Sequence, residues 1–300
     1  MARAELDWQR DGADWPNRAA SLFVESGGMR WHVQHAGSGP SLLLLHGTGA
    51  STHSWRGLLP RLAERVTVIA PDLPGHGFTQ MPPGGGLGLA AMSAAVTRLM
   101  RDLGHAPSTG VGHSAGAAIL ARMALDNTDD GAGVGHIISL NGAFVPLFGA
   151  AGVVMPALAR LVTHVPFLPN VLAWRGEDKR AVERLLASTG SDIDAEGVAL
   201  YQRLFATRRH VAAALGMMAQ WDLPTLWSDL PRLPARLSLI ASSGDLTIPA
   251  TQAYDVQKRA GSAVGNVPSV QLVRRLGHLA HEEAPDTIAA MIAPLLERPA

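Results

Sequence analysis

The stretch Gly112-His113-Ser114-Ala115-Gly116 decides the fold of this 300-residue chain. It follows a short apolar segment, 108–112, predicted as a strand, and opens a small-residue apolar segment, 115–126, predicted as a helix. The pattern G-x-S-x-G at such a junction predicts a sharp strand-to-helix turn that lifts the serine hydroxyl out of the sheet. Glycine is required two residues to either side because neighbouring backbone passes very close to the turn.

Ser114 is therefore the candidate nucleophile. Its hydroxyl is expected at a helix N-terminus, where free N–H groups and the helix dipole favour developing negative charge. The alternative is a tight turn that merely contains a serine. The predicted strand and helix on either side favour the catalytic interpretation.

A second glycine-rich turn, Leu45-His46-Gly47-Thr48-Gly49, follows another apolar strand at 41–45. In this layout, a backbone N–H from the turn and the N–H after the nucleophile form an oxyanion hole. We predict the N–H groups of Thr48 and Ala115 as the two donors. The alternative is a glycine-rich turn without a catalytic role.

A serine nucleophile needs a general base, and the base needs a carboxylate that orients it. In this type of fold the expected chain order is serine, acid, histidine. Asp245 and His278 each follow a predicted strand, so we predict Asp245 as the acid and His278 as the base. His281 competes for the base and Asp222 for the acid. Asp72 is predicted to belong to a structural loop beside the site.

Short apolar runs alternate with helical patterns along most of the chain. After a hairpin at 24–36, strands are predicted at 41–45, 66–70, 108–112, 136–140, 237–241 and 270–273, with helices at 55–65, 89–103, 115–126, 250–260 and 285–297. This alternation predicts an α/β fold with a mostly parallel sheet of about eight strands, covered by helices on both faces.

The alternation stops between about 144 and 230. No convincing strand occurs there, and helical patterns recur instead, at 150–163, 178–188, 194–206 and 208–220. We therefore divide the chain into three parts: an N-terminal extension (1–20), a core (21–143 and 231–300) and a helical cap (144–230). The cap is inserted between the sixth and seventh predicted strands, so it is expected as a lid over Ser114.

The first part of this predicted cap, 144–174, is unusually apolar. As a ceiling over the nucleophile it would suit a large hydrophobic ligand. We assign its Phe148 and Met155 to the substrate pocket, together with His46, His113 and Trp55 from the core. The alternative is that the apolar residues form the small core of the cap itself.

Composition excludes several functions. Hydrophobic residues make up 47% of the chain and charged residues 17%, against a usual ~25%, so a large core is expected. The 25 Lys and Arg residues balance 25 Asp and Glu residues, which argues against nucleic acid as a partner. The absence of cysteine excludes disulfides, thiolate metal sites and cysteine nucleophiles.

No cofactor and no metal are predicted. His32 and His35 have a spacing that suggests metal ligation, but residues three apart on a strand face opposite sides. No cluster of carboxylates indicates a magnesium site.

The segment 131–159 contains no Asp, Glu, Lys or Arg and would be long enough to span a membrane. Its glycines and prolines instead favour a buried strand, a loop and an apolar helix. The N-terminus is polar and has no signal-peptide core, so a cytoplasmic location is expected. Peripheral contact with a membrane is left open.

Five motifs together resemble the α/β-hydrolase fold, over about residues 20 to 297: Leu45-His46-Gly47, Pro71-Asp72-Leu73-Pro74-Gly75-His76-Gly77, Gly112-His113-Ser114-Ala115-Gly116, Gly244-Asp245 and Gly277-His278. Three further strings resemble one branch of that superfamily: Asp14-Trp15-Pro16-Asn17-Arg18, Arg30-Trp31-His32-Val33-Gln34 and His46-Gly47-Thr48-Gly49-Ala50-Ser51-Thr52-His53-Ser54-Trp55. This branch is the magnesium-chelatase accessory proteins of bacteriochlorophyll biosynthesis, the BchO family.

The resemblance implies a role near the insertion of magnesium into protoporphyrin IX. It implies a tetrapyrrole as a hydrophobic ligand and magnesium chelatase subunits as partners, but it supplies no defined reaction. Haloalkane dehalogenases and epoxide hydrolases of this fold carry aspartate at the position of Ser114, which argues against those two activities. Carbon–carbon bond hydrolases, haloperoxidases without a cofactor and general carboxylesterases remain open.

Three functions follow as hypotheses. The first is a serine hydrolase acting on an ester, thioester or amide of a hydrophobic substrate. The second is a non-catalytic accessory protein that binds a porphyrin or stabilises the chelatase. The third is a peripheral membrane protein with a cap helix in the interface. Three triad members in the expected order favour the first hypothesis, whereas the branch resemblance favours the second or a mixture.

Overall fold

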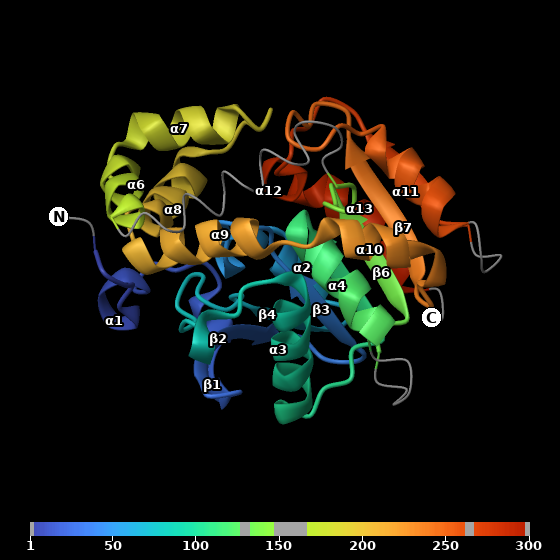
Figure 1. Ribbon diagram of the computed structural model, residues 1–300, viewed down its shortest axis with the longest axis horizontal. Helices are drawn as coiled ribbons and strands as arrows, with labels where there is room; N and C mark the ends of the chain where they lie inside the picture. The colour runs from blue at the N-terminus through green and yellow to red at the C-terminus, as the bar shows by residue number, and fades with distance from the viewer. Residues whose placement is uncertain (1–2, 127–132, 147–166, 262–266, 298–300) are drawn as a thin grey trace.

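The computed structural model describes residues 3–126, 133–146, 167–261 and 267–297. They form an eight-stranded sheet in the order β1-β2-β4-β3-β5-β6-β7-β8, flanked by helices (Figure 1). The hairpin β1 (Ser21–Ser26) and β2 (Met29–Ala36) is antiparallel, and β2 pairs antiparallel with β4 (Thr67–Pro71). The remaining neighbours pair in parallel. The predicted fold class is confirmed.

The other strands end close to their predicted limits. They are β3 (Ser41–Leu45), β5 (Thr109–His113), β6 (His136–Leu140), β7 (Arg236–Ser242) and β8 (Ser269–Val273). Helices α2 (Leu58–Ala63), α3 (Leu89–Asp102), α4 (Ala115–Asp126), α11 (Gln252–Ala260), α12 (Ala280–Glu283) and α13 (Pro285–Leu296) complete the core.

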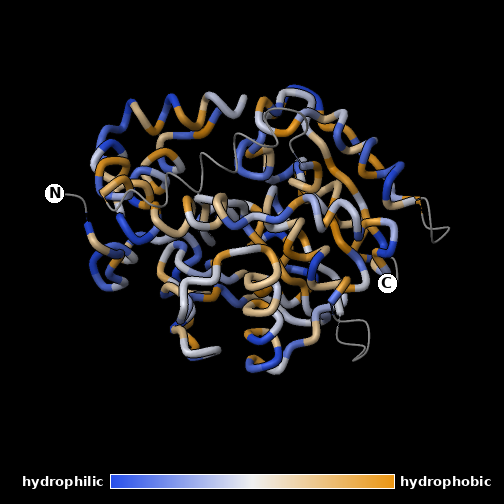
Figure 2. The backbone as a smooth tube through the Cα atoms, viewed as in Figure 1, coloured by the Kyte–Doolittle hydropathy of each residue, from blue (hydrophilic) through white to orange (hydrophobic). Residues whose placement is uncertain are grey.

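Side chains on β3 show why the sheet is covered on both faces. Leu43 and Leu45 belong to a large apolar cluster with α3 and α4, whereas Leu42 and Leu44 belong to a second cluster with α2 and α13. Successive strand residues point to opposite faces, so a continuous apolar run is stable only when both faces are buried. Residues of high hydropathy accordingly lie mostly in the interior of the molecule (Figure 2).

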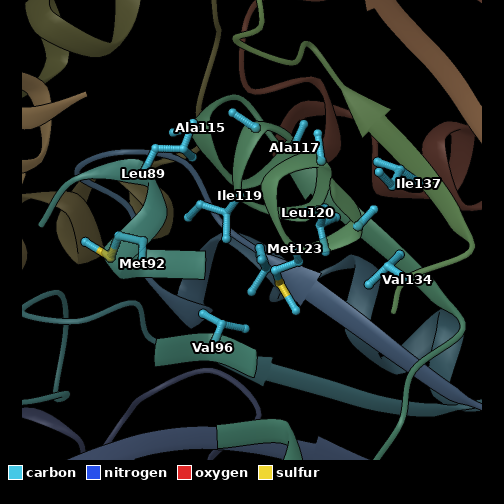
Figure 3. Packing of buried hydrophobic residues seen from close by; sticks show 14 of the residues in the cluster. Leu89, Met92, Val96, Ala115, Ala117, Ile119, Leu120, Met123, Val134 and Ile137 are labelled. Carbon is cyan, nitrogen blue, oxygen red and sulfur yellow. The ribbon is translucent and has the colours of Figure 1, made fainter. Parts of the chain in front are cut away.

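The larger cluster holds α3 and α4 together. Leu89, Met92 and Val96 of α3 lie near Ile119 and Met123 of α4 (Figure 3). Five of the first seven residues of α4 are alanine or glycine, so its backbone can lie close to the sheet. The helix that follows Ser114 is therefore fixed by packing along its whole length.

Strand order places the predicted site at one edge. The chain runs from β3 to β4 on one side and then crosses to β5 on the other side of β3. Ligand sites of open α/β sheets lie where the strand order reverses, outside the carboxyl ends of the strands. The turns after β3 and β5 meet there, and β7 and β8 end at the same edge before Asp245 and His278.

Between β6 and β7, the part of the chain that the structure describes is helical. It contains α6 (Leu168–Gly176), α7 (Lys179–Ala187), α8 (Ala195–Phe205), α9 (Arg208–Gln220) and α10 (Leu223–Asp229). Helices α7, α8 and α9 were predicted, α6 and α10 were not, and the predicted helix at 150–163 lies outside the described residues. We call α6 to α9 the cap helices; three of them, α6 to α8, group at one end of the molecule (Figure 1).

Helix α10 belongs to the core layer. Leu226 and, just after the helix, Leu230 join the large apolar cluster, and Asp229 pairs with Arg122 of α4 at 2.7 Å. The sequence-based cap boundary at 230 therefore includes a helix that packs on α4.

The N-terminal residues join the cap helices to the hairpin. Arg203 pairs with Asp14 at 2.6 Å, and Arg209 with Glu5 at 2.8 Å. Leu6, Trp15, Phe78, Leu200 and Leu204 form a small apolar cluster behind these ion pairs. The helix α1 (Trp8–Asp11) lies in this segment.

Helix α6 presents apolar side chains to solvent. Phe167, just before it, is 65% exposed, Val171 50% and Trp174 63%. Across the described ranges, no helix combines the length and apolarity needed to cross a bilayer.

Candidate active site

The turn around Ser114 has the strained geometry of a nucleophile elbow. Ser114 has φ of 51°, in the left-handed region that non-glycine residues rarely adopt. A Cβ at Gly112 would collide with the backbone of Ala117, and one at Gly116 with the carbonyl of Leu45. Both glycines are therefore required by close backbone approach, as the pattern predicts.

Two backbone hydrogen bonds hold the elbow against β6. The N–H of Ser114 donates to the carbonyl of Leu140 at 3.0 Å, and the carbonyl of Ser114 accepts from the N–H of Ala143 at 3.0 Å. Since β6 is itself a buried central strand, the strained conformation is fixed from outside.

The turn after β3 approaches the elbow closely. A Cβ on Gly47 would lie 3.0 Å from the Cβ of Ser114. Ser114 and Thr48 are half-buried, whereas their immediate neighbours are buried. The N–H groups of Thr48 and Ala115 donate no hydrogen bond to any described residue. Their use as an oxyanion hole stays a prediction.

The predicted base and acid are paired. Nδ1 of His278 lies 2.7 Å from Oδ2 of Asp245, and the two residues are 7% and 6% exposed. The other oxygen of Asp245 accepts from the N–H groups of Thr247 at 2.7 Å and Ile248 at 2.8 Å. A carboxylate fixed in this way keeps the proton on Nδ1, which leaves the Nε2 lone pair available as a base.

The loop with His278 lies next to the elbow. Nε2 of His113 is 3.0 Å from the carbonyl oxygen of His278, and the two rings are 4.7 Å apart between centroids. The hydroxyl of Ser114 makes no hydrogen bond within the ranges that the structure describes. Catalytic hydrogen bonds often tighten only when substrate is bound, so the Ser114–His278 contact stays a prediction.

The competing candidates have other partners. Nε2 of His281 lies 2.7 Å from Oγ of Ser54, and its ring packs on Trp55. Asp222 caps α10 by accepting the N–H of Thr225 at 3.1 Å.

Asp72 holds a loop, as predicted. Its carboxylate lies 2.8 Å from Nδ1 of His32 and accepts the N–H groups of Thr52 at 2.7 Å and Phe78 at 2.9 Å. Burial alone would raise the pKa of Asp72, but the facing His32 and these hydrogen bonds hold the pKa below its ordinary value.

Comparison with known proteins places this geometry in a family. The model of the alpha/beta hydrolase family matches residues 42–291. The magnesium-chelatase 30 kDa subunit of Rhodobacter capsulatus is 39% identical over 289 residues, which cover 95% of this chain and 97% of that protein. This chain belongs to the α/β-hydrolase family. Within it, the chain falls in the branch of the magnesium-chelatase 30 kDa subunit, as the sequence motifs indicated.

Solved structures share the fold. The epoxide hydrolase CorEH is 24% identical, with a TM-score of 0.75 over 92% of this chain and 99% of that one. A serine hydrolase involved in carbazole degradation is 19% identical, with a TM-score of 0.71 over 93% and 99% of the two chains. At these identities the likeness concerns the fold alone.

Three side chains assigned to the substrate pocket lie behind the site. His46, His113 and Trp55 are each at most 2% exposed. His46 accepts the N–H of Leu73 at 2.9 Å and lies 2.8 Å from the carbonyl of Gly47, so it braces the turn after β3. Trp55 packs in the second apolar cluster. All three rings are buried in this structure, and their assignment to the substrate pocket stays a prediction.

The other two pocket assignments, Phe148 and Met155, lie outside the described residues. Among the ranges described, no group of three or more His, Asp or Glu side chains is arranged to hold a metal.

Several buried histidines surround the site and are neutral at pH 7. Burial lowers the pKa of His210 to about 4 and that of His281 to about 3. Burial also takes the pKa of His53, His76 and His113 well below the ordinary value. These buried histidines are therefore hydrogen-bonding groups and not cations.

Asn141 is a site residue that the sequence analysis did not single out. It follows β6 with φ of 47°. Its Nδ2 donates to the carbonyl of His278 at 2.9 Å and to Oγ of Ser242 at 3.1 Å, and its Oδ1 accepts the N–H of Ser242 at 2.8 Å. An asparagine directly after a buried strand was the available signal, because asparagine tolerates the left-handed region better than most residues.

Proposed function

We propose that this protein is a serine hydrolase with an accessory role in the insertion of magnesium into protoporphyrin IX, in (bacterio)chlorophyll biosynthesis. The observation that carries the catalytic part is the buried His278–Asp245 pair, 2.7 Å apart, beside the strained elbow of Ser114. The proposed substrate is an ester, thioester or amide of a hydrophobic molecule.

The mechanism assigns one role to each group. Oγ of Ser114 attacks the carbonyl carbon while Nε2 of His278 takes its proton. Asp245 orients the imidazole and stabilises the imidazolium that forms. The N–H groups of Thr48 and Ala115 hold the oxyanion. His278 then protonates the leaving group, and water releases the acyl group from Ser114 by the same steps.

The chelatase part rests on the relative from Rhodobacter capsulatus, whose match spans nearly the whole of both chains. The proposed partners are therefore magnesium chelatase subunits, and the proposed hydrophobic ligand is a tetrapyrrole. The exposed side chains of Phe167, Val171 and Trp174 support peripheral contact with a membrane, since aromatic residues favour the interface.

A second candidate is a non-catalytic accessory protein that binds a porphyrin or stabilises the chelatase. Two observations favour it: the hydroxyl of Ser114 has no hydrogen bond in the described structure, and the relative is named as a chelatase subunit. General carboxylesterase or carbon–carbon bond hydrolase activity is a further alternative that the same triad would serve.

A labelling experiment separates these candidates. Purified protein is treated with a fluorophosphonate probe and, in parallel, titrated with protoporphyrin IX. The hydrolase proposal expects labelling of the wild type and of Asp222→Asn, and none of Ser114→Ala. Porphyrin binding without labelling or esterase activity would leave the non-catalytic candidate.

A further inference from the structure

A loop of the helical insertion lies between the loops that carry the acid and the base. It consists of Thr189, Gly190 and Ser191, within the connection 188–194 between α7 and α8. The carbonyl of Thr189 accepts two N–H groups, that of Leu246 at 3.1 Å and that of His278 at 3.3 Å. Leu246 directly follows Asp245, so the carbonyl of Thr189 binds both the chain next to Asp245 and the backbone of His278 itself.

Glycine permits this contact on both sides. Gly190 has φ of 82°, and a Cβ there would collide with the carbonyl of Gly244. A Cβ on Gly277 would collide with the backbone of Gly190. The three backbones therefore touch directly, and the insertion loop cannot move without disturbing the acid and base loops.

Ser191 supplies the side-chain contact. It is 6% exposed, and its Oγ accepts the N–H of Leu279 at 2.9 Å. Leu279 directly follows His278. Glu283 completes the arrangement, because its carboxylate accepts the N–H of Gly277 at 2.8 Å and that of Asp192 at 3.3 Å.

The base is thus held from two sides. From Gly277 to Leu279, the second and third N–H groups donate to the insertion loop and the first donates to Glu283. From the core, His113 and Asn141 both lie at hydrogen-bond distance from the carbonyl of His278, at 3.0 and 2.9 Å.

A second buried contact ties the following helix to the insertion. Glu282 in α12 accepts hydrogen bonds from Oγ of Ser54 and from the hydroxyl of Tyr201 in α8, each at 2.7 Å, and pairs with Arg56. The insertion therefore contacts the chain after His278 at two places, at Leu279 through Ser191 and at Glu282 through Tyr201.

We propose that the loop Thr189–Ser191 is a positioning element of the catalytic site and that Ser191 is its positioning residue. The loop sets the backbone of His278, and so the placement of its ring between Asp245 and Ser114. The inference rests on the proposed hydrolase function for its kinetic consequence. Misplacement of a catalytic group by about 1 Å costs on the order of 10²-fold in rate, so a small displacement of this loop has a measurable effect.

The test compares Ser191→Ala with Ser188→Ala in the full-length protein. Ser188 lies three positions earlier and is exposed, and its Oγ donates only to the carbonyl of Leu185. With p-nitrophenyl butyrate, Ser191→Ala is expected to lower kcat about tenfold with KM within about twofold, while Ser188→Ala matches the wild type. Ser191→Thr keeps the hydroxyl and is expected to restore kcat. Wild-type kcat in Ser191→Ala would overturn the proposal.

A second measurement does not depend on turnover. The proton on Nδ1 of His278 is followed by NMR as a downfield resonance, assigned by its loss in His278→Gln. The proposal expects this resonance to broaden or shift in Ser191→Ala and to stay unchanged in Ser188→Ala. If the wild type shows no esterase activity and no probe labelling, the hydrolase function fails, and this resonance alone decides the positioning role. An identical resonance in all three proteins would overturn it.

Discussion

The elbow at Ser114 and the base loop at His278 are fixed in different ways. The elbow is held by its own glycines and by backbone bonds to the adjacent strand β6. The loop Gly277–Leu279 is held by Glu283 nearby and, mainly, by groups far away in the sequence: His113 of β5, Asn141 after β6 and the loop between α7 and α8. The geometry of the elbow can be predicted from a short sequence motif. The contacts of the His278 loop depend mainly on residues that only the folded chain brings together.

The largest effect on activity is expected from a substitution in the elbow at Ser114. Ser114→Ala removes the proposed nucleophile and should lower hydrolysis of p-nitrophenyl esters by on the order of 10⁶-fold. Far-UV circular dichroism and the midpoint of thermal unfolding should stay close to the wild type, because the hydroxyl has no hydrogen-bond partner among the described residues. Esterase activity that survives the substitution would mean that Ser114 is not the nucleophile.

Substitution of Asp245, the proposed acid, tests the region around His278. In Asp245→Asn the amide oxygen still accepts from Thr247 and Ile248, but its NH₂ group faces Nδ1 of His278. The proton must then move to Nε2, which can no longer accept the proton of Ser114. We expect kcat to fall by on the order of 10⁴-fold. Steady-state kinetics with p-nitrophenyl esters measure this loss, and a kcat of Asp245→Asn close to that of the wild type would contradict the assignment of Asp245 as the acid.

The two regions also differ in how far the sequence predicts them. Helix α4, helix α9 and strand β6 have the predicted limits, because each is an apolar pattern between clear breaks. Asp245 and His278 could be predicted as neighbours because both follow strands that end at the same edge, and the structure pairs them. Their catalytic roles stay predictions. Phe148 and Met155 remain predictions.

What the sequence could not show depends on contacts between distant residues. His46 and Trp55 carry the chemistry of pocket residues, but packing turns both into buried supports. Ser191 belongs to no motif, and only the fold brings it to Leu279, 88 positions away. Helix α10 was missed because it is short and its cap, Asp222, was weighed as a triad acid.

The buried histidines make the stability of the fold depend on pH. His210 and His281 have a pKa of about 4 and about 3 in the folded protein, below the ordinary 6.5. The unfolded chain therefore binds more protons, and stability present above pH 6.5 is lost as pH falls toward 4. Each residue should lower the free energy of unfolding by about 1 kcal/mol between pH 7 and pH 5.5.

Urea unfolding at pH 7 and pH 5.5 measures this loss. His210→Gln and His281→Gln should each show a smaller difference between the two pH values than the wild type, even if they are less stable at both. A variant with the same pH dependence as the wild type would show that folding does not lower the pKa of the substituted histidine.

The smallest effect concerns Asp222, the carboxylate that competes with Asp245. Its side chain accepts the N–H of Thr225 at the start of α10, which packs on α4 through Leu226. Asp222→Ala should therefore lower the free energy of unfolding by about 1 kcal/mol, the usual value for a lost helix cap. Activity toward p-nitrophenyl esters should stay within about twofold of the wild type, since Asp222 caps α10 and takes no part in the His278–Asp245 contact. Urea unfolding and steady-state kinetics on the same sample decide the matter. A large loss of kcat without a loss of stability would return Asp222 to the triad and remove Asp245 from it.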